Sequence, residues 1–583
     1  MAIRFPAPVR PICISSLLLV SSALTTAPPA FADTVAAVHD GRPTADACAN
    51  LGFPVQRADM EKSQAGTRRL QLGGGAGNYG LSAPAMPMPM PEMGVIAGAP
   101  PAAALASVDT EKYPHATSNP VKRVGEDPVS TFSIDVDTAS YANVRSFLSD
   151  GTLPPRDAVR VEELLNYFDY GYAGPTSADE PFKANVTVTP SPWAPGKEII
   201  HIGLQGYAIA TTKQPPLNLV FLIDVSGSMD EPDKLPLVQK ALNVLIDQLR
   251  PEDRVSMVVY AGAAGAVLPP TAGNQKLVMR CAVDALTAGG STAGGEGLAL
   301  AYDMAQENFA KDTVNRVVLM TDGDFNVGVA DPDKLQDFVA EKRKTGVYLS
   351  AFGVGHGNYN DLMMQTLSQA GNGTAGYIDT LDEARKLFRD DFSSSLFPIA
   401  DDVKIQVEFN PAQVSEYRLI GYETRLLDRS DFNNDRVDAG EVGSGASVTA
   451  LYEITPVGGP VASDPLRYQK VDETVVPASG DELAFIKIRY KLPGGSTSKL
   501  MERPITKADT VASVAEAPEA TRWALAVAGF GQQLRGDPWM QTAADWASIR
   551  VLADGARGAD PYGLRAEFVR LIRDAEDAKP VNG

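Results

Sequence analysis

Residues 217–235 read LNLVFLIDVSGSMDEPDKL, an apolar run that ends abruptly in oxygen-bearing side chains. Asp224, Ser226 and Ser228 stand at alternate positions, directly after what the apolar run predicts to be a buried strand. Side chains of this kind at the end of a strand either cap the helix that follows or hold a cation. The surrounding sequence favours the second interpretation.

Strand-like and helix-like patterns alternate from residue 217 to residue 397. The strand-like runs LNLVFLID, RVSMVVYA, RVVLMTD and VYLSAFGVG are apolar almost throughout, and the segment 234–250 repeats apolar residues with helical spacing. Strands without a polar face, separated by amphipathic helices, are typical of a parallel sheet that is covered on both sides. We therefore predict an α/β unit with a doubly wound, mostly parallel sheet.

Strand-like runs with alternating apolar and polar residues precede and follow this unit in the sequence. FKANVTVTPSPW and KEIIHIGLQGYAI precede it, and VKIQVEF, YRLIGYETRLL, ASVTALYEI and ELAFIKIRY follow it, with apolar and polar residues in alternation. We expect the α/β unit to be inserted into one β-sandwich-like domain built from both flanks. Two short helices broken by GTLPP and two closing helices marked by Trp523 and Phe568 complete the pattern.

These patterns divide the chain into seven parts. They are a signal peptide (1–32), an unassigned region (33–72), a Gly-, Pro-, Ala- and Met-rich flexible linker (73–127), N-terminal helices and strands (128–216), the α/β unit (217–397), a β-rich region (398–500) and a helical region (501–583).

The first residues have the features of a signal peptide. Arg4 and Arg10 precede the apolar run ICISSLLLVSSAL, and AFA at 30–32 is a small-residue cleavage site, so we expect cleavage after Ala32 and a periplasmic or extracellular protein. Cys13 lies before the apolar run, which is a poor place for a lipid anchor. No later stretch has the roughly 18–20 apolar residues of a membrane span. The net charge of −20 argues against nucleic-acid binding.

Two cysteines remain after the signal peptide. Cys48 and Cys281 could form one disulfide bond. Cys281, however, stands in the helical pattern KLVMRCAVDAL, which favours an unpaired, buried apolar position.

Three loops bring oxygen ligands to one edge of the predicted sheet. Asp224 closes the first strand, Asp322 in VVLMTDGDFN closes another, and Thr292 lies in the turn AGGSTAGG before a helix. The carboxyl ends of parallel strands form the ligand-binding edge of such sheets. Carboxylate and hydroxyl oxygens suit Mg²⁺, with Mn²⁺ and Ca²⁺ as alternatives. A site with two carboxylates leaves a coordination position that an acidic group of a partner can fill.

The motifs DVSGSM, GGSTAGG and TDG, in this order, resemble the von Willebrand factor type A (VWA) domain and its metal-ion-dependent adhesion site (MIDAS). The resemblance assigns Asp224, Ser226 and Ser228 to the first metal loop, Thr292 to the second and Asp322 to the third. It implies that an acidic side chain of a protein ligand completes the coordination of the cation.

Segments outside the α/β unit are similar to the bacterial YfbK-type envelope proteins. The similarity rests on PVSTFSIDVDTASYANVRSFL, AVRVEELLNYFDY, PSPWAPGKEIIHIGLQG and DFNNDRVDAGEVGSG, and it covers residues 128–583. Such proteins carry the VWA domain between an N-terminal segment and a C-terminal domain of unknown function.

We therefore expect a metal-dependent protein-binding module of the cell envelope rather than an enzyme. The chain has four histidines, no G-x-S-x-G motif and no zinc-ligand spacing. The alternatives are an envelope enzyme or enzyme subunit that uses the cation as a Lewis acid, and a cation with a purely structural role.

The acidic loop DFNNDRVDAGEV, residues 431–442, has some features of a calcium-binding loop. Asp431, Asn433 and Asp435 have the ligand spacing, but Arg436 stands where an EF-hand needs glycine and Val442 where it needs glutamate. A solvated turn is the favoured interpretation, and a Ca²⁺ site is the alternative.

Overall fold

The computed structural model describes residues 38–39, 42–53, 111–134, 136–289, 294–323, 332–357, 359–437, 439–464, 480–540 and 545–580. The predicted signal peptide and most of the predicted linker lie outside the described residues. No helix in the described part of the chain is long and apolar enough to span a membrane.

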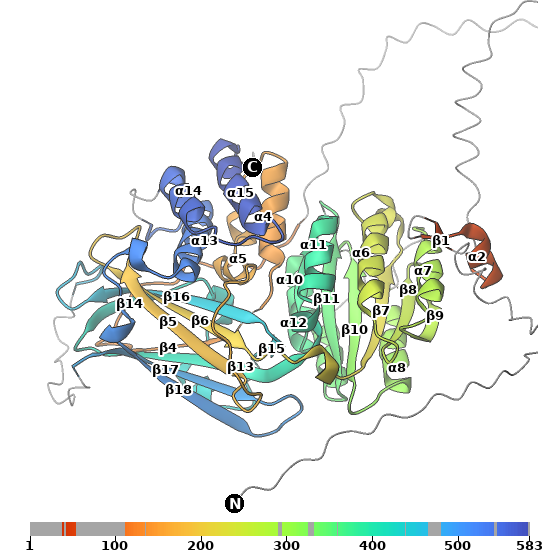
Figure 1. Cartoon of the computed structure of the whole chain (residues 1–583), viewed down its shortest axis with the longest axis horizontal. Helices are drawn as coiled ribbons and strands as arrows, with labels where there is room; N and C mark the ends of the chain where they lie inside the picture. Colours follow the sequence, from red (N-terminus) through yellow and green to blue (C-terminus); the bar gives the residue numbers. More distant parts are fainter. Residues whose placement is uncertain are drawn as a thin grey trace, which may run out of the picture.

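A six-stranded sheet forms the centre of the α/β unit, with the strand order β12-β11-β10-β7-β8-β9 (Figure 1). All neighbouring strands are parallel except β8 and β9. The predicted doubly wound, mostly parallel sheet is therefore confirmed; the short strand β12 and the antiparallel edge strand β9 had not been recognised in the sequence. The strands are β7 (Leu217–Asp224), β8 (Arg254–Tyr260), β9 (Ala264–Ala272), β10 (Val314–Thr321), β11 (Val347–Val354) and β12 (Ala375–Ile378).

Helices cover both faces of this sheet because side chains of successive strand residues point to opposite faces. Leu219 and Phe221 of β7 pack in one apolar cluster with α6, whereas Val220 and Leu222 pack in another with α8 and α10. The first face carries α6 (Leu235–Gln248), α7 (Lys276–Asp284), α11 (Leu381–Arg385), the π-helical turn Lys386–Asp390 and α12 (Phe392–Leu396), and the second carries α8 (Gly294–Glu307), α9 (Pro332–Arg343) and α10 (Asp361–Ala370).

Strands from both sides of the α/β unit build a β-sandwich. One sheet has the order β15-β13-β17-β18 with β4 also paired to β13, and the other has the order β3-β14-β16-β6-β5. Phe132 and Ile405 of the first sheet share a buried core with Ile202 and Tyr452 of the second. The predicted insertion of the α/β unit into one β domain is confirmed. The strands are β3 (Lys122–Arg123), β4 (Val129–Ser133), β5 (Phe182–Pro190), β6 (Glu198–Gly206), β13 (Pro398–Phe409), β14 (Val414–Ile420), β15 (Gly440–Gly443), β16 (Ser447–Pro456), β17 (Glu482–Lys491) and β18 (Ser498–Thr506).

One predicted strand is shorter than its apolar pattern. The run YRLIGYETRLL leaves β14 after Ile420, since Gly421 (φ 78°) and Tyr422 (φ 61°) adopt left-handed backbone conformations that a strand cannot accommodate.

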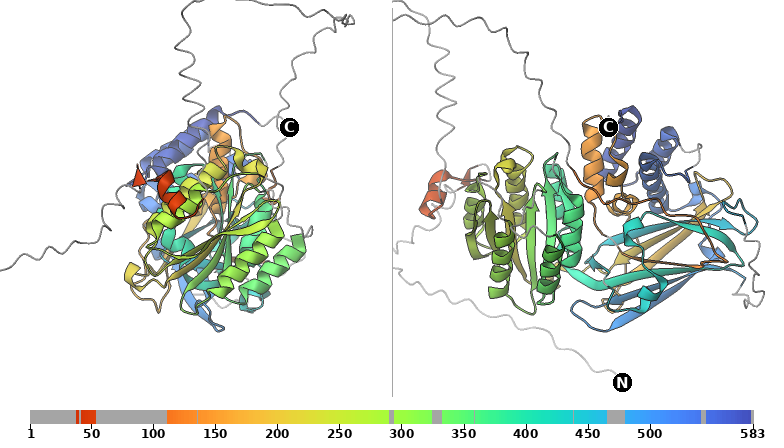
Figure 2. Two further views of the ribbon diagram at one scale, coloured as in Figure 1. Left: turned by 90° about the vertical axis from the view of Figure 1, so that its right-hand side faces the viewer. Right: turned by 180° about the vertical axis from the view of Figure 1, so that it is seen from behind.

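A helical layer covers the outer face of the second sheet of the sandwich. Ile199 of β6 and Leu451 of β16 pack against Trp523 and Phe568 of this layer. Seen from behind in Figure 2, the layer lies above the sandwich, and its helix α4 is the one nearest the α/β unit. The helices are α4 (Ala139–Ser149), α5 (Val161–Asn166), α13 (Glu519–Arg535), α14 (Trp546–Gly555) and α15 (Leu564–Asp577).

A disulfide bond joins Cys48 of α2 (Ala45–Asn50) to Cys281 of α7. The strands β1 (Val38–His39) and β2 (Arg42–Pro43) precede α2. The preference for an unpaired Cys281 was therefore wrong: this cysteine is helical and 1% exposed, but it is covered by the small N-terminal segment, to which it is bonded. The partner lies 233 residues away in the chain, so helical periodicity could not indicate it.

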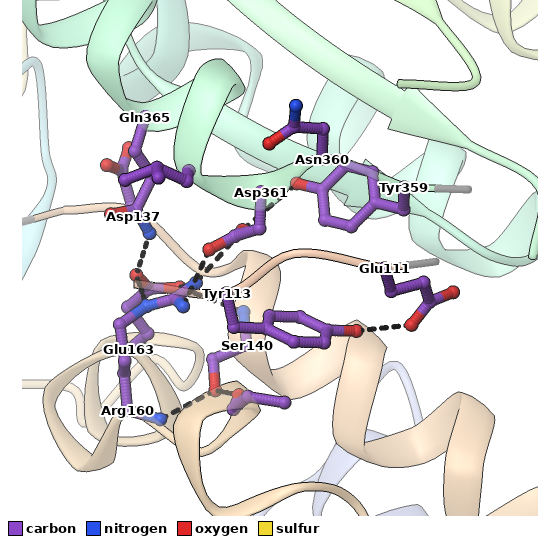
Figure 3. A network of polar contacts seen from close by, with 12 residues as sticks. Glu111, Tyr113, Asp137, Ser140, Arg160, Glu163, Tyr359, Asn360, Asp361 and Gln365 are labelled. Carbon is purple, nitrogen blue, oxygen red and sulfur yellow. Dashed lines mark hydrogen bonds and ion pairs between the residues drawn. The ribbon is translucent and has the colours of Figure 1, made fainter. Parts of the chain in front are cut away.

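Buried ion pairs fix the helical layer to the α/β unit (Figure 3). The Nε of Arg160 donates to Glu163, and its Nη2 donates to Asp361 Oδ1 at 3.1 Å. Its Nη1 lies 2.7 Å from Asp361 Oδ2, which is an ion pair without hydrogen-bond geometry. Tyr359 donates to Asp361 at 3.1 Å, and Gln365 donates to Glu163 at 2.9 Å. Buried charges are tolerated when paired in this way, and the pairing fixes the relative placement of the two units.

A second buried arginine, Arg145 of α4, links three segments. Its guanidinium donates to Asp379 (2.7 Å from Nε) and to Glu383 (2.7 Å from Nη2) in the α/β unit, and to Glu567 of α15 (2.9 Å from Nη1). Buried ion pairs thus join the α/β unit to the helical layer at several points.

Candidate functional site

The predicted metal loops lie side by side at the carboxyl edge of the sheet. Asp224 is the last residue of β7, and Asp322 directly follows the neighbouring parallel strand β10. Both carboxylates are fully buried, at 0% exposure. The parallel register, in which Met320 lies opposite Ile223, is what brings two residues 98 positions apart in the sequence to the same place.

Three donors orient the Asp224 carboxylate. The Ser226 backbone N–H donates to Oδ1 at 2.9 Å, and the hydroxyls of Tyr260 and Thr321 each donate to Oδ2 at 3.0 Å. Burial raises the pKa of the Asp224 carboxyl above its ordinary value and the charge of Asp322 raises it further, whereas hydrogen bonds from Ser226 and Thr321 act in the opposite direction. Two carboxylates thus lie close enough to repel each other in a buried place.

Ser226 and Ser228 direct their hydroxyls at each other. Their Oγ atoms are 3.0 Å apart. Ser226 precedes a 3₁₀ turn, Gly227–Asp230, but its side chain makes no capping hydrogen bond to it, and α6 begins only at Leu235. The capping interpretation therefore does not apply to Ser226. Ser226 is 4% exposed, whereas Ser228 is exposed, so the pair runs from the buried carboxylates to solvent.

Thr292, the remaining predicted ligand, lies outside the described residues. Among the residues that are described, no group of three or more His, Cys, Asp or Glu side chains is arranged as a metal site. The predicted site has two carboxylates only, so it depends on hydroxyl oxygens for its other protein ligands. That donor set, with two repelling carboxylates and paired hydroxyls, fits a hard divalent cation such as Mg²⁺.

Lys234 is a site residue that the motif analysis missed. Its Nζ lies 3.0 Å from Asp322 Oδ2, and the residue is 7% exposed. Gly355, which follows β11 with φ 75°, allows this placement, because a Cβ there would overlap the lysine stem. The signal in the sequence is the cationic residue in DEPDKL, which the helical spacing of 234–250 places only at the start of a helix.

His356 was also missed, and it connects the segment after the predicted metal loop to α4. Its Nδ1 lies 2.9 Å from Asp233 Oδ2, and its Nε2 contacts the hydroxyl of Ser146. Ser146 is a buried residue of α4, so this contact joins the segment before α6 to the helical layer. Nothing in the spacing of the four histidines had distinguished His356.

Two acidic groups of the loop at 431–442 are hydrogen-bonded within the protein. Asp431 Oδ2 accepts the Asp428 backbone N–H at 3.1 Å, and Asp435 Oδ1 accepts from Ser498 at 2.6 Å and from Arg489 at 3.0 Å. The hydrogen bond from Ser498 is the largest cause that lowers the pKa of Asp435. These contacts support the favoured interpretation of a turn.

Comparisons with known proteins agree with this architecture. Residues 218–390 match the von Willebrand factor type A domain family, residues 394–578 match the family described as uncharacterized protein YfbK, C-terminal, and residues 107–201 match a family described as von Willebrand factor. The uncharacterized protein YfbK of Escherichia coli (strain K12) is 43% identical over 484 residues, which cover 82% of this chain and 83% of that protein.

More distant proteins share parts of the chain. Human inter-alpha-trypsin inhibitor heavy chain H3 is 27% identical over 222 residues, which cover 35% of this chain and 24% of the human protein. A solved von Willebrand factor type A protein from Catenulispora acidiphila covers 71% of this chain and 99% of its own length, with 18% identity and a TM-score of 0.39. By its sequence and its domain order, this chain belongs to the YfbK family of VWA-domain proteins.

Proposed function

We propose that this protein is an exported binding module. Its VWA domain would hold a divalent cation, Mg²⁺ in the first place, and use it to bind an Asp or Glu carboxylate of a protein partner. The observation that carries the proposal is the gathering of the Asp224 carboxylate, the Ser226–Ser228 hydroxyl pair and Asp322 at one edge of the sheet.

The electrostatics of this edge support a cation. Burial and the neighbouring charge of Asp322 raise the pKa of the Asp224 carboxyl, and a divalent cation bound there would remove the cost of ionising it. The exposure of Ser228 supports access from solvent. A cation that reaches solvent at one position makes contact with a carboxylate both strong and directional.

Family membership supports a protein as the ligand, because VWA domains commonly mediate protein interactions. We propose binding rather than catalysis as the role of the site. The acidic side chains at the site are themselves the proposed ligands, so they are poor candidates for a general base.

We further propose that the protein functions outside the cytoplasm. The Cys48–Cys281 disulfide supports this, since such bonds form and persist in oxidising compartments. The signal-like segment before Ala32 agrees with it. Fractionation of expressing cells, with determination of the mature N-terminus, tests the proposal: a cytoplasmic protein that retains residues 1–32 would contradict it.

The metal site is tested by calorimetric titration of Mg²⁺, Mn²⁺ and Ca²⁺ into the metal-stripped mature protein. Saturable binding is expected in the wild type and not in Asp224→Ala/Asp322→Ala. The matched control is Asp431→Ala/Asp435→Ala, which removes two carboxylates from the acidic loop and is expected to bind like the wild type. Equal binding in all three proteins, or none in any, would remove the adhesion-site proposal, and loss of Ca²⁺ binding in the control alone would move the site to the loop.

The same proteins separate binding from the alternatives. If the cation serves binding, protein partners captured from envelope extract should be released by EDTA and should not be captured by the double variant. A structural cation predicts that the double variant melts at a lower temperature but captures the same partners.

A further inference from the structure

Lys234 places a positive charge inside the proposed cation site. Its Nζ lies 3.0 Å from Asp322 Oδ2, its side chain is 9% exposed, and that of Asp322 is 0% exposed. An ion pair so far from solvent is weakly screened, so its charge acts on anything bound at the same edge.

The lysine is held in this place from several directions. The segment before α6 is fixed on one side by the contact of Asp233 with His356, which also contacts Ser146 of α4. On the other side, Gly355 gives the room that the lysine stem occupies. The backbone N–H groups of Leu237 and Val238 both donate to the Lys234 carbonyl at 2.9 Å, which fixes the residue to the start of α6. This lysine is therefore part of the site and not a mobile surface group.

The charges of the described buried groups then add up to an unusual total. When both carboxyls are ionised, Asp224 and Asp322 contribute two negative charges and Lys234 one positive charge, which leaves −1. Asp230 and Glu231 are also nearby in the sequence, but both are exposed, so water screens their charges. A divalent cation would change the buried total to +1, and one carboxylate from outside would bring it to zero.

This total distinguishes the site from one made of two aspartates alone. Without the lysine, the buried charge would be −2, and a divalent cation would neutralise it completely. With the lysine, the cation-filled site keeps one positive charge in a poorly solvated place, where an uncompensated charge is costly. An anionic ligand relieves that cost. The lysine therefore weakens the binding of the cation and strengthens the binding of the acidic partner.

We propose that Lys234 sets the charge of the site, making it hold the cation less tightly and an acidic ligand more tightly. The inference rests on the proposed function and names what that function leaves open: why the filled site selects an acidic group. Removal of this one charge should therefore change the two affinities in opposite directions, which loss of packing or partial unfolding would not do.

The test compares wild type, Lys234→Met and Lys234→Gln in the full mature protein. Met keeps the length of the apolar stem and Gln keeps polarity. The control is Lys344→Met, which removes the same charge at the opposite end of the sheet, before β11, where Lys344 pairs with exposed Glu341. Mn²⁺ affinity is measured by calorimetry in chloride and in acetate at equal ionic strength, with acetate as the carboxylate probe.

Both Lys234 variants should bind Mn²⁺ about tenfold more tightly than wild type in chloride, because a full charge within one side-chain length of the cation is gone. Acetate should tighten Mn²⁺ binding in wild type and in Lys344→Met, because two ligands that favour each other do so reciprocally. In the Lys234 variants the acetate effect should be small.

Unchanged or weaker Mn²⁺ binding in both folded Lys234 variants would overturn the inference. An acetate effect equal to that of wild type, or no acetate effect in wild type, would also overturn it. In each of these cases the proposed cation site survives, provided that Asp224→Ala abolishes Mn²⁺ binding. Absence of saturable Mn²⁺ binding in wild type would instead remove both the proposed function and this inference.

Discussion

Histidine 201 should make the stability of the flanking domain depend on pH in a predictable way. His201 lies in β6 with 2% exposure, and its ring nitrogens contact Tyr172 (2.8 Å from Nε2) and Thr521 (2.9 Å from Nδ1). Burial lowers the pKa of this imidazole from 6.5 to about 3. The folded protein therefore keeps His201 neutral at any pH near neutrality.

The sign and size of the effect follow from that pKa. Above pH 6.5 neither state binds the proton, so the contribution of His201 to stability is fully present. Below pH 6.5 the unfolded chain takes up a proton that the folded protein refuses until about pH 3, so folding loses about 1.4 kcal/mol per pH unit in this window. Between pH 6.5 and pH 5 the loss amounts to about 2 kcal/mol.

The assay is chemical denaturation of wild type and His201→Gln, followed by tryptophan fluorescence. All four tryptophans (193, 523, 539 and 546) lie outside residues 217–397, so the signal reports the domain that contains His201. The unfolding free energy of wild type minus that of the variant should fall by about 2 kcal/mol from pH 7.5 to pH 5. His115→Gln removes an exposed histidine and is the matched control, with a smaller change expected.

A difference between wild type and His201→Gln that is the same at both pH values would refute the reasoning. It would mean that the folded protein admits a proton to His201 as easily as the unfolded chain does. A value of wild type minus variant that rises towards pH 5 would have the opposite sign and would refute the reasoning as well.

Three further predictions concern packing and covalent linkage. Arg145→Met leaves buried carboxylates without their cation and should destabilise the contact between α4 and the α/β unit by about 3–5 kcal/mol, measured by chemical denaturation. Gly373→Ala should lower the melting temperature or abolish folding, because its Cβ would overlap the carbonyl of Leu349. Gly289→Ala should melt like the wild type, because no atom of the described residues beyond its chain neighbours lies within 4 Å of the added Cβ. Reduction of the disulfide should cost about 2–4 kcal/mol in unfolding experiments, and Cys281→Ser should lose the sensitivity to reductant.

Local patterns in the sequence determined the secondary structure and the central part of the site. The apolar run 217–224 predicted β7, and the alternation of strands and helices after it predicted the parallel sheet, since side-chain periodicity is a local property of the backbone. Once the sheet is parallel, its carboxyl edge follows, and with it the meeting of Asp224 and Asp322. The proximity of these two side chains could be predicted because strand ends are visible in the sequence.

The same reasoning failed where the partner of a residue lies far along the chain. Cys48 and Cys281 are 233 residues apart, and Arg160 is 201 residues from Asp361, so no periodicity connects them. The sequence pattern also did not predict that β14 ends before Gly421, because an apolar pattern can continue through a turn as well as through a strand.

The sequence by itself thus determined an α/β unit inserted in a β domain, and a set of oxygen-bearing side chains at one edge of its sheet. Only the tertiary structure decided the charge of that edge, by placing Lys234 against Asp322. It also decided how the α/β unit is attached to the helical layer, by placing two buried arginines between them. The physical reason is that periodicity is encoded between near neighbours, whereas the total charge of a buried site depends on which side chains the fold brings together.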